Sequence, residues 1–105
     1  MDFCNSNEAL NEIALDIKEG ADMIIIKPAT FYLDIVSKAK SNFNIPIISY
    51  QVSGEYAMLK YASQNGVCNF EDILFENLIA QKRAGVTAIV TYGAIEMAKE
   101  LQVKL

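Results

Sequence analysis

The sequence predicts an α/β fold in which helices alternate with the strands of a parallel sheet. Three short apolar runs are each followed by a helical pattern within 105 residues, which is one domain's length. Strands joined through helices pair in parallel, and such strands are apolar on both faces. Because the connections between the strands all have the same handedness, the few helices of this chain should lie on one face of the sheet only. We therefore expect an arc of a larger closed barrel.

The first predicted element is a helix over Asn5 to Glu19. Asn5 and Glu8, three residues apart, have the form of a capping box with Asn in place of Ser or Thr. Gly20 is a suitable residue to close the helix. The buried stripe is predicted from apolar residues at helical spacing: Ala9, Leu10, Ile13, Ala14 and Ile17.

A strand over Met23 to Ile26 follows, and Lys27 is its polar end. Pro28 cannot donate a ladder hydrogen bond, so we expect pairing to stop there. A lysine in an apolar, partly closed cavity favours the neutral amine, which condenses with ketones to a Schiff base. The alternative is a strand-end lysine that only reaches into water.

The remaining elements repeat the strand–helix order. Pro46 suits the first residue of a strand, Asn69 is the expected cap of the longest remaining helix, and Gly85 ends that helix. In order, we predict a helix over Thr30 to Lys40, a strand over Ile47 to Val52, a turn over Ser53 to Glu55, helices over Tyr56 to Gln64 and Glu71 to Arg83, a strand over Ala88 to Tyr92 and a helix over Ala94 to Leu101.

Composition excludes several classes of function. A net charge of −4 without a basic cluster argues against nucleic-acid binding. No apolar run approaches the ~18 residues of a membrane span, and no secretory signal is visible at the amino terminus. Cys4 and Cys68 lack metal-ligand spacing and the chain has no histidine. We predict free thiols in a reducing cytoplasm rather than a disulfide or a zinc pair.

Polar side chains gather at the carboxyl ends of the predicted strands. Lys27, Ser53 and Tyr92 lie at or just past these ends, and Tyr50 lies near its own. In parallel α/β folds this end carries ligand binding and chemistry. An amine, a hydroxyl and a phenol would form a pocket for a carbonyl and a carboxylate. The alternative is a turn hydroxyl in Ser53 and aromatic residues at the core edge in Tyr50 and Tyr92.

Several long runs closely resemble the porphobilinogen synthase family, also called delta-aminolevulinic acid dehydratase. The likeness covers nearly the whole chain, in the correct order. The runs are Asn5 with Glu8-Ala9-Leu10, Gly20 to Pro28, Tyr32-Leu33-Asp34-Ile35, Tyr50 to Met58, and Arg83-Ala84-Gly85 leading into Thr91-Tyr92. The resemblance implies a (β/α)8 TIM barrel. Residues 1–105 would be the carboxyl-terminal part of that single domain: its last three strand–helix units and the helix before them, incomplete as a free chain.

The resemblance also implies an activity and roles for residues. The family condenses two aminolevulinate molecules to porphobilinogen, in haem and tetrapyrrole biosynthesis. By its pattern Lys27 is the Schiff-base lysine, and Ser53 and Tyr92 bind the carboxylate of one substrate. Glu12 falls where many bacterial members bind an allosteric magnesium ion. Members are usually homo-octamers assembled through an amino-terminal arm.

A full member is much longer than this chain. The earlier strands, the second active-site lysine, the arm and the loop that binds zinc in zinc-dependent members have no counterpart here, and Met1-Asp2 coincides with an internal Met-Asp of the family. We therefore expect the isolated chain to be inactive, and insoluble or molten because its apolar face is bare. It would be a non-catalytic remnant, or a half-barrel that works only with a complementary amino-terminal piece. A self-standing small α/β binding domain is the remaining alternative.

Overall fold

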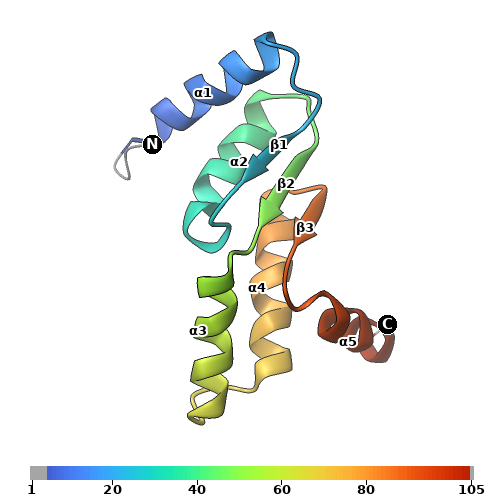
Figure 1. Cartoon of the computed structure of the whole chain (residues 1–105). Coiled ribbons are helices and arrows are strands. Elements are labelled where there is room, and N and C mark those ends of the chain that lie inside the picture. Colours follow the sequence, from blue (N-terminus) through green and yellow to red (C-terminus); the bar gives the residue numbers. More distant parts are fainter. Residues whose placement is uncertain (1–4, 105) are drawn as a thin grey trace.

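Strands and helices alternate along the chain in the predicted order (Figure 1). The computed structural model describes residues 5–104. Within this range the elements are α1 (Ser6–Lys18), β1 (Ile24–Ile26), the 3-10 helix η1 (Thr30–Tyr32), α2 (Leu33–Asn42), β2 (Ile47–Tyr50), α3 (Ser53–Gln64), α4 (Phe70–Ala84), β3 (Ala88–Val90) and α5 (Ala94–Lys104).

Two asparagine side chains cap helices as predicted. The Asn5 side chain accepts hydrogen bonds from the backbone N–H groups of Asn7 and Glu8 at the start of α1. The Asn69 side chain accepts one from the N–H of Asp72 at the start of α4, at 3.0 Å. Each bond satisfies a donor that the first helical turn leaves without an intrahelical partner. The sequence therefore fixes both helix starts locally.

The strands form a parallel sheet in the order β1-β2-β3 among the described residues. Ile24 pairs with Ile47 between β1 and β2, and Ser49 pairs with Ile89 between β2 and β3. Side chains alternate between the two faces of a strand. Accordingly, Ile24 and Ile26 are buried, whereas Ile25 between them is 58% exposed.

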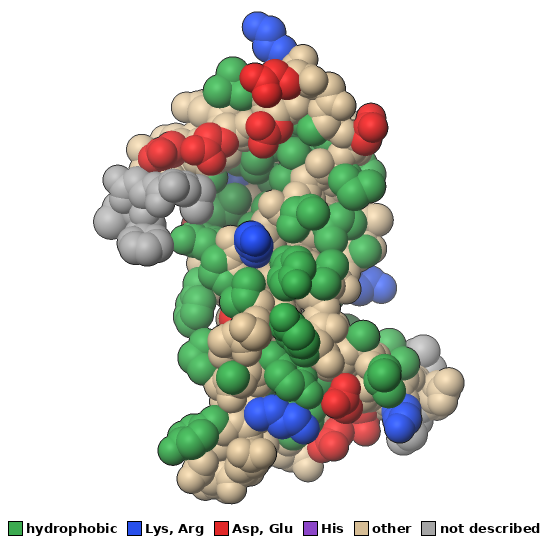
Figure 2. Space-filling model, viewed as in Figure 1, with side chains coloured by type: hydrophobic (Ala, Val, Ile, Leu, Met, Phe, Trp, Pro, Cys, Tyr) green, Lys and Arg blue, Asp and Glu red, His purple; other side chains and the backbone are tan. Residues whose placement is uncertain are grey.

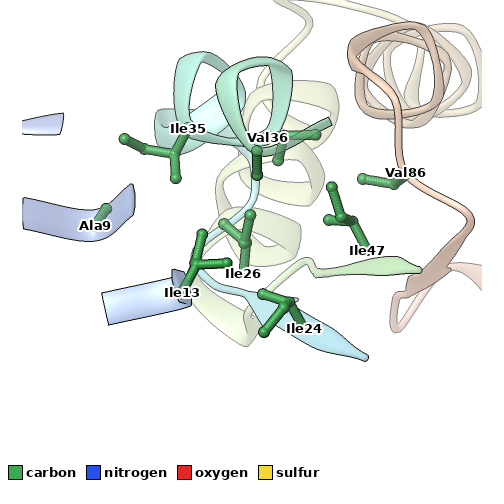
Figure 3. Packing of buried hydrophobic residues seen from close by; sticks show 9 residues of the cluster. Ala9, Ile13, Ile24, Ile26, Ile35, Val36, Ile47 and Val86 are labelled. Atoms are coloured by element: carbon green, nitrogen blue, oxygen red, sulfur yellow. The ribbon is translucent and has the colours of Figure 1, made fainter. Parts of the chain in front are cut away.

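The buried face of the sheet packs against helices. In Figure 1, α2 and α4 lie behind the strands, α1 lies beyond α2, and α3 runs alongside α4. Figure 3 shows side chains of β1 and β2 pointing toward α2. Ala9 and Ile13 of α1 complete the cluster next to β1. A second cluster joins α4 and α5 around Leu74, and Ile89 packs against both clusters.

The opposite face of the sheet is bare, as predicted. Ile25 is 58% exposed and Val90 is 44% exposed, although both lie within strands. Figure 2 shows hydrophobic side chains gathered over the middle of this face. The described residues cover one face of a parallel sheet and do not close a barrel. This confirms the prediction of an arc.

Several predicted boundaries are wrong. Ser53 to Glu55 is not a turn, because α3 already begins at Ser53, directly after the extended residue Val52. A Ser-Gly-Glu sequence is typical of turns, but an acid in a helix's first turn is also favoured by the helix dipole. The strands are shorter than predicted: β2 ends at Tyr50 and β3 at Val90. The predicted helix from Thr30 starts as the 3-10 turn η1 before α2.

Of the two cysteines, the structure describes Cys68. Cys68 has a free thiol, 3.6 Å from the hydroxyl oxygen of Ser63. Cys4 and the Met1-Asp2 pair lie outside the described residues. Across residues 5–104, no helix combines the length and the apolar character needed to cross a membrane.

Candidate active site at the carboxyl ends of the strands

Lys27 directly follows β1, at the carboxyl end of the sheet. Its side chain is exposed, and its Nζ lies 5.8 Å from the centroid of the Tyr50 ring, which β2 contributes. Lys27 also lines a hollow of about 230 Å³ between β1 and α1, together with Ile25 and Glu12. Pro28 follows Lys27 through a cis peptide bond. The predicted nucleophile therefore stands at the end of β1, beside an aromatic ring.

Tyr92 lies two residues beyond the end of β3, and its side chain is 59% exposed. With Tyr50, Val90 and Thr91 it lines a smaller hollow of about 100 Å³. Its ring lies 6.0 Å from the ring of Tyr56 of α3, at an interplanar angle of 47°. Tyr50 thus lies beside both Lys27 and Tyr92, and it joins two of the three predicted site residues.

Tyr56, whose ring contacts that of Tyr92, makes two further contacts of its own. Its ring meets the ring of Phe70 edge to face at 5.6 Å, and its hydroxyl donates to a carboxylate oxygen of Glu96 at 3.3 Å. Burial, the negative charge of Glu96 and that hydrogen bond, in this order, raise the pKa of Tyr56 above its ordinary value of 10.0. The phenol therefore stays neutral and keeps donating to Glu96 at neutral pH.

Ser53 is the first residue of α3, and its side chain is exposed. The backbone N–H groups of a first helical turn lack intrahelical partners and favour anions. The contacts described above join Lys27 and Tyr92 through Tyr50, and Ser53 takes part in none of them. Its hydroxyl is positioned by α3 rather than by the aromatic residues.

Glu12 is exposed on α1, and it lines the same hollow as Lys27. Asp16, one helical turn further along, is a second carboxylate on that hollow. Magnesium prefers oxygen ligands in near-octahedral geometry. Within residues 5–104, no group of three or more Asp, Glu, His or Cys side chains could hold a metal ion. The described side chains therefore do not make a complete magnesium site around Glu12.

Buried polar residues beneath the site were missed by the sequence analysis. Gln51 and Gln81 are fully buried and Glu55 is 4% exposed. They form a hydrogen-bonded network with Asn77 of α4, whose amide nitrogen donates to the hydroxyl of Thr30 at 3.0 Å. A signal was present, because Asn77 and Gln81 lie one helical turn apart beside the buried residues of α4.

Comparison with known proteins gives one consistent result. The sequence model of the family "Delta-aminolevulinic acid dehydratase" matches residues 1–100. A delta-aminolevulinic acid dehydratase from Archaeoglobus fulgidus is 49% identical over 102 residues, which are 97% of this chain and 31% of that protein. One from Staphylococcus aureus is 48% identical over 101 residues, 96% of this chain and 31% of its own length. The chain thus spans about a third of the curated relatives it matches.

A solved structure matches as well. The delta-aminolevulinic acid dehydratase (porphobilinogen synthase) of Toxoplasma gondii ME49, in complex with its reaction product porphobilinogen, superposes with a TM-score of 0.91 at 45% identity. The match covers 94% of this chain and 28% of that one. The arrangement of strands and helices described above is therefore shared with part of that enzyme.

Proposed function

The chain belongs to the delta-aminolevulinic acid dehydratase family, and from this premise we propose that it supplies the Schiff-base part of a porphobilinogen synthase site. The observation that carries the proposal is the position of Lys27. It follows β1 at the carboxyl end of a parallel sheet, where α/β folds bind their ligands. The substrate would be aminolevulinate, a ketone that carries a carboxylate.

Lys27 would act as the nucleophile. Its neutral amine adds to the ketone carbon of aminolevulinate, and loss of water from the carbinolamine leaves an imine. The imine holds this substrate covalently while the second aminolevulinate condenses with it to porphobilinogen. A closed, dry barrel favours the neutral form of a lysine. Lys27 is exposed in the described chain, so its reactivity should depend on the remaining strands of a barrel.

Ser53 and Tyr92 would bind the carboxylate of that substrate. Ser53 offers a hydroxyl at the start of α3, where unpaired backbone N–H groups favour an anion. Tyr92 offers a phenol at the rim of the hollow that it shares with Tyr50. Two such contacts would fix the orientation of the ketone over Lys27, which lowers the entropic part of the barrier.

We propose that the chain is inactive alone and works only with the rest of the barrel. Its bare sheet face carries the exposed side chains of Ile25 and Val90, and a parallel sheet needs cover on both faces. The remaining strands, on this or another polypeptide, would cover that face and enclose Lys27. Without them the substrate would meet an open surface.

Coexpression with a complementary segment tests the proposal. The chain would be produced with the portion of the Staphylococcus aureus relative that precedes the matched region, and porphobilinogen would be measured by colour formation from aminolevulinate. We expect product from the combined chains and none from either alone. Product from the 105-residue chain alone would overturn the dependence on other strands. No product from a stable, copurified complex would overturn the activity.

Borohydride trapping locates the reactive amine. Reduction of the imine should leave a stable aminolevulinate adduct, which peptide mass spectrometry would place on Lys27. Lys27→Ala should abolish the adduct and the activity of the complex. Lys82→Ala, a change at an exposed lysine of α4, is the matched control and should leave both unchanged. An adduct that survives in Lys27→Ala would mean that another amine reacts.

Metal, assembly and location are further parts of the proposal. An allosteric magnesium ion would take one carboxylate from Glu12, and the described side chains do not supply a complete set of further ligands. The homo-octamer that the resemblance implies would be tested by light scattering on the complex. A cytoplasmic location is supported by the free thiol of Cys68, since a reducing compartment preserves thiols.

A further inference from the structure

A hydrogen-bonded network links the segments after β1 and β2. The hydroxyl of Thr30 donates to Oε2 of Glu55 at 2.9 Å, and the backbone N–H of Thr30 reaches the same oxygen at 3.4 Å. Thr30 is three residues beyond Lys27, and Glu55 is two residues beyond Ser53. One carboxylate oxygen therefore joins the segment that carries Lys27 to the first turn of α3.

Asn77 extends this link to the loop after β3. Its amide nitrogen donates to the Thr30 hydroxyl at 3.0 Å, and its amide oxygen accepts a bond from Gln51 at 2.8 Å. The side-chain oxygen of Gln51 accepts the hydroxyl of Thr91, whose oxygen in turn accepts the N–H of Gly93 at 3.0 Å. Thr91 and Gly93 flank Tyr92.

Several side chains of the network are buried. Gln51 is fully buried, Glu55 is 4% exposed, and Oε1 of Glu55 is buried without a hydrogen-bond partner. Gln81, also fully buried, donates to the Asn77 oxygen at 2.9 Å and accepts the Ser49 hydroxyl at 2.6 Å. Buried polar groups are costly unless they are paired, so such a network is sensitive to the loss of one member. Apolar side chains at these positions would fill the core without needing hydrogen-bond partners, so stability alone does not call for this network.

We propose that this network is a clamp that sets the positions of Lys27, Ser53 and Tyr92 relative to one another, and that Thr30, Glu55 and Asn77 are its positioning residues. None of the three would touch the substrate. Each acts through a residue that lies one to three positions from it or through another member of the network. This inference rests on the proposed function, because it assigns a purpose to the spacing of those three side chains.

A matched pair of substitutions at Thr30 tests the clamp directly. Thr30→Val keeps the shape of the side chain but removes the hydroxyl that bonds to both Asn77 and Glu55, whereas Thr30→Ser keeps the hydroxyl. In the chain combined with its complementary segment, loss of paired buried groups should speed amide hydrogen exchange by roughly tenfold in residues 27–32 and 51–56 of the Val variant. The Ser variant should exchange like the unchanged chain. Helix α1 contains no member of the network and serves as the internal control.

A second readout separates positioning from stability. Borohydride trapping on Lys27 would be compared for levulinate, which has a carboxylate, and its methyl ester, which has none, in the chain combined with its complementary segment. We expect the unchanged chain and Thr30→Ser to prefer levulinate severalfold, and Thr30→Val to lose most of this preference. A variant that is only less stable would lower both adducts in proportion and leave the preference intact.

The outcomes distinguish the clamp from the proposed function. Equal exchange in the Val and Ser variants, or faster exchange in the Val variant throughout α1 as well, would overturn the clamp whatever the chemistry. An intact preference for levulinate in Thr30→Val would overturn the positioning role. No adduct on Lys27 in the unchanged complex, or equal adducts with acid and ester, would overturn the proposed function, while the exchange comparison would still decide the clamp.

Discussion

The side-chain nitrogen Nζ of Lys27 lies 5.8 Å from the centroid of the Tyr50 ring. The two residues come from neighbouring strands, since Lys27 directly follows β1 and Tyr50 ends β2. A cation at this distance from an aromatic ring gains about 0.5–1 kcal/mol at an exposed site. The contact therefore restrains an otherwise exposed lysine side chain, on the face of the sheet that the helices leave bare.

We predict that Tyr50→Leu lowers the amount of aminolevulinate trapped on Lys27 in the combined chains by about twofold to fivefold, because the ring no longer restrains the position of the lysine side chain. Tyr50→Phe keeps the ring and should trap as the unchanged protein does. Quantitative mass spectrometry of the reduced adduct is the measurement. Equal trapping in the Leu and Phe variants would show that the ring does not orient the amine.

Gly93 leads to a prediction about stability. A Cβ atom at this position would lie 2.7 Å from Cδ2 of Leu74, and Leu74 is fully buried. Gly93→Ala should therefore destabilise the chain by about 1–3 kcal/mol, as overpacking does. The free energy of unfolding of the combined chains in urea would be the measurement, at constant ionic strength.

Gly54→Ala is the matched control for Gly93→Ala. Nothing lies within 4 Å of a Cβ at Gly54, which is in the first turn of α3. Alanine there should be neutral or stabilising by about 0.5–1 kcal/mol, because glycine is a weak helix former. If both alanine variants unfolded at the same urea concentration, the close approach of Leu74 to Gly93 would carry no energetic weight.

The pKa of Tyr56 predicts how stability changes at high pH. This pKa is raised above 10.0 by burial and by Glu96, so the folded state favours the neutral phenol. Stability from this group is complete below the unfolded-state pKa of about 10 and is lost as the pH rises through the folded-state pKa. Urea unfolding of the combined chains between neutral pH and about pH 11 should show this loss. Tyr56→Phe should remove this contribution.

Glu96→Gln separates the charge of Glu96 from the other causes of the raised pKa of Tyr56. It removes the negative charge beside the phenol but leaves the burial, which is the larger cause. The pKa of Tyr56 should therefore fall while staying above its ordinary value. Ultraviolet titration of the phenolate, with Tyr56→Phe subtracted as background, is the measurement. An unchanged titration curve would mean that the charge of Glu96 does not act on the phenol, because the amide oxygen of glutamine can still accept the hydroxyl.

Local signals in the sequence predicted the order of elements and the bare face correctly. The Asn5 and Asn69 caps depend on residues within three positions of them, and the one-sided cover follows from the number and order of the helices. The start of α3 at Ser53 was missed because a Ser-Gly-Glu sequence fits a turn and a first helical turn equally well. Tertiary packing decides between the two.

The buried network was not predicted because its partners are far apart in sequence. Thr30 and Glu55 are 25 residues apart, and Thr30 and Asn77 are 47 apart. A polar residue on an amphipathic helix is usually read as solvated, and only the fold brings Asn77 to Thr30. By contrast, the position of Lys27 at the end of β1 was predicted from the apolar run before it. Its role as a site residue is a prediction from the three strand ends together and from the resemblance.

Neighbouring isoleucines of β1 give a final prediction about the bare face. Ile25 is 58% exposed and Ile24 is 7% exposed, although the two are adjacent in one strand. Ile25→Thr should reduce binding of a hydrophobic dye to the chain alone, because it removes apolar surface from the bare face. Ile24→Thr places a hydroxyl in the core and should cost about 1–3 kcal/mol or more. The two variants would be compared by dye fluorescence of the chain alone and by urea unfolding of the combined chains. The combined chains should bind little dye with or without Ile25→Thr, because the remaining strands would then cover this face. Strong dye binding by the combined chains would mean that the bare face is not where the rest of the barrel packs.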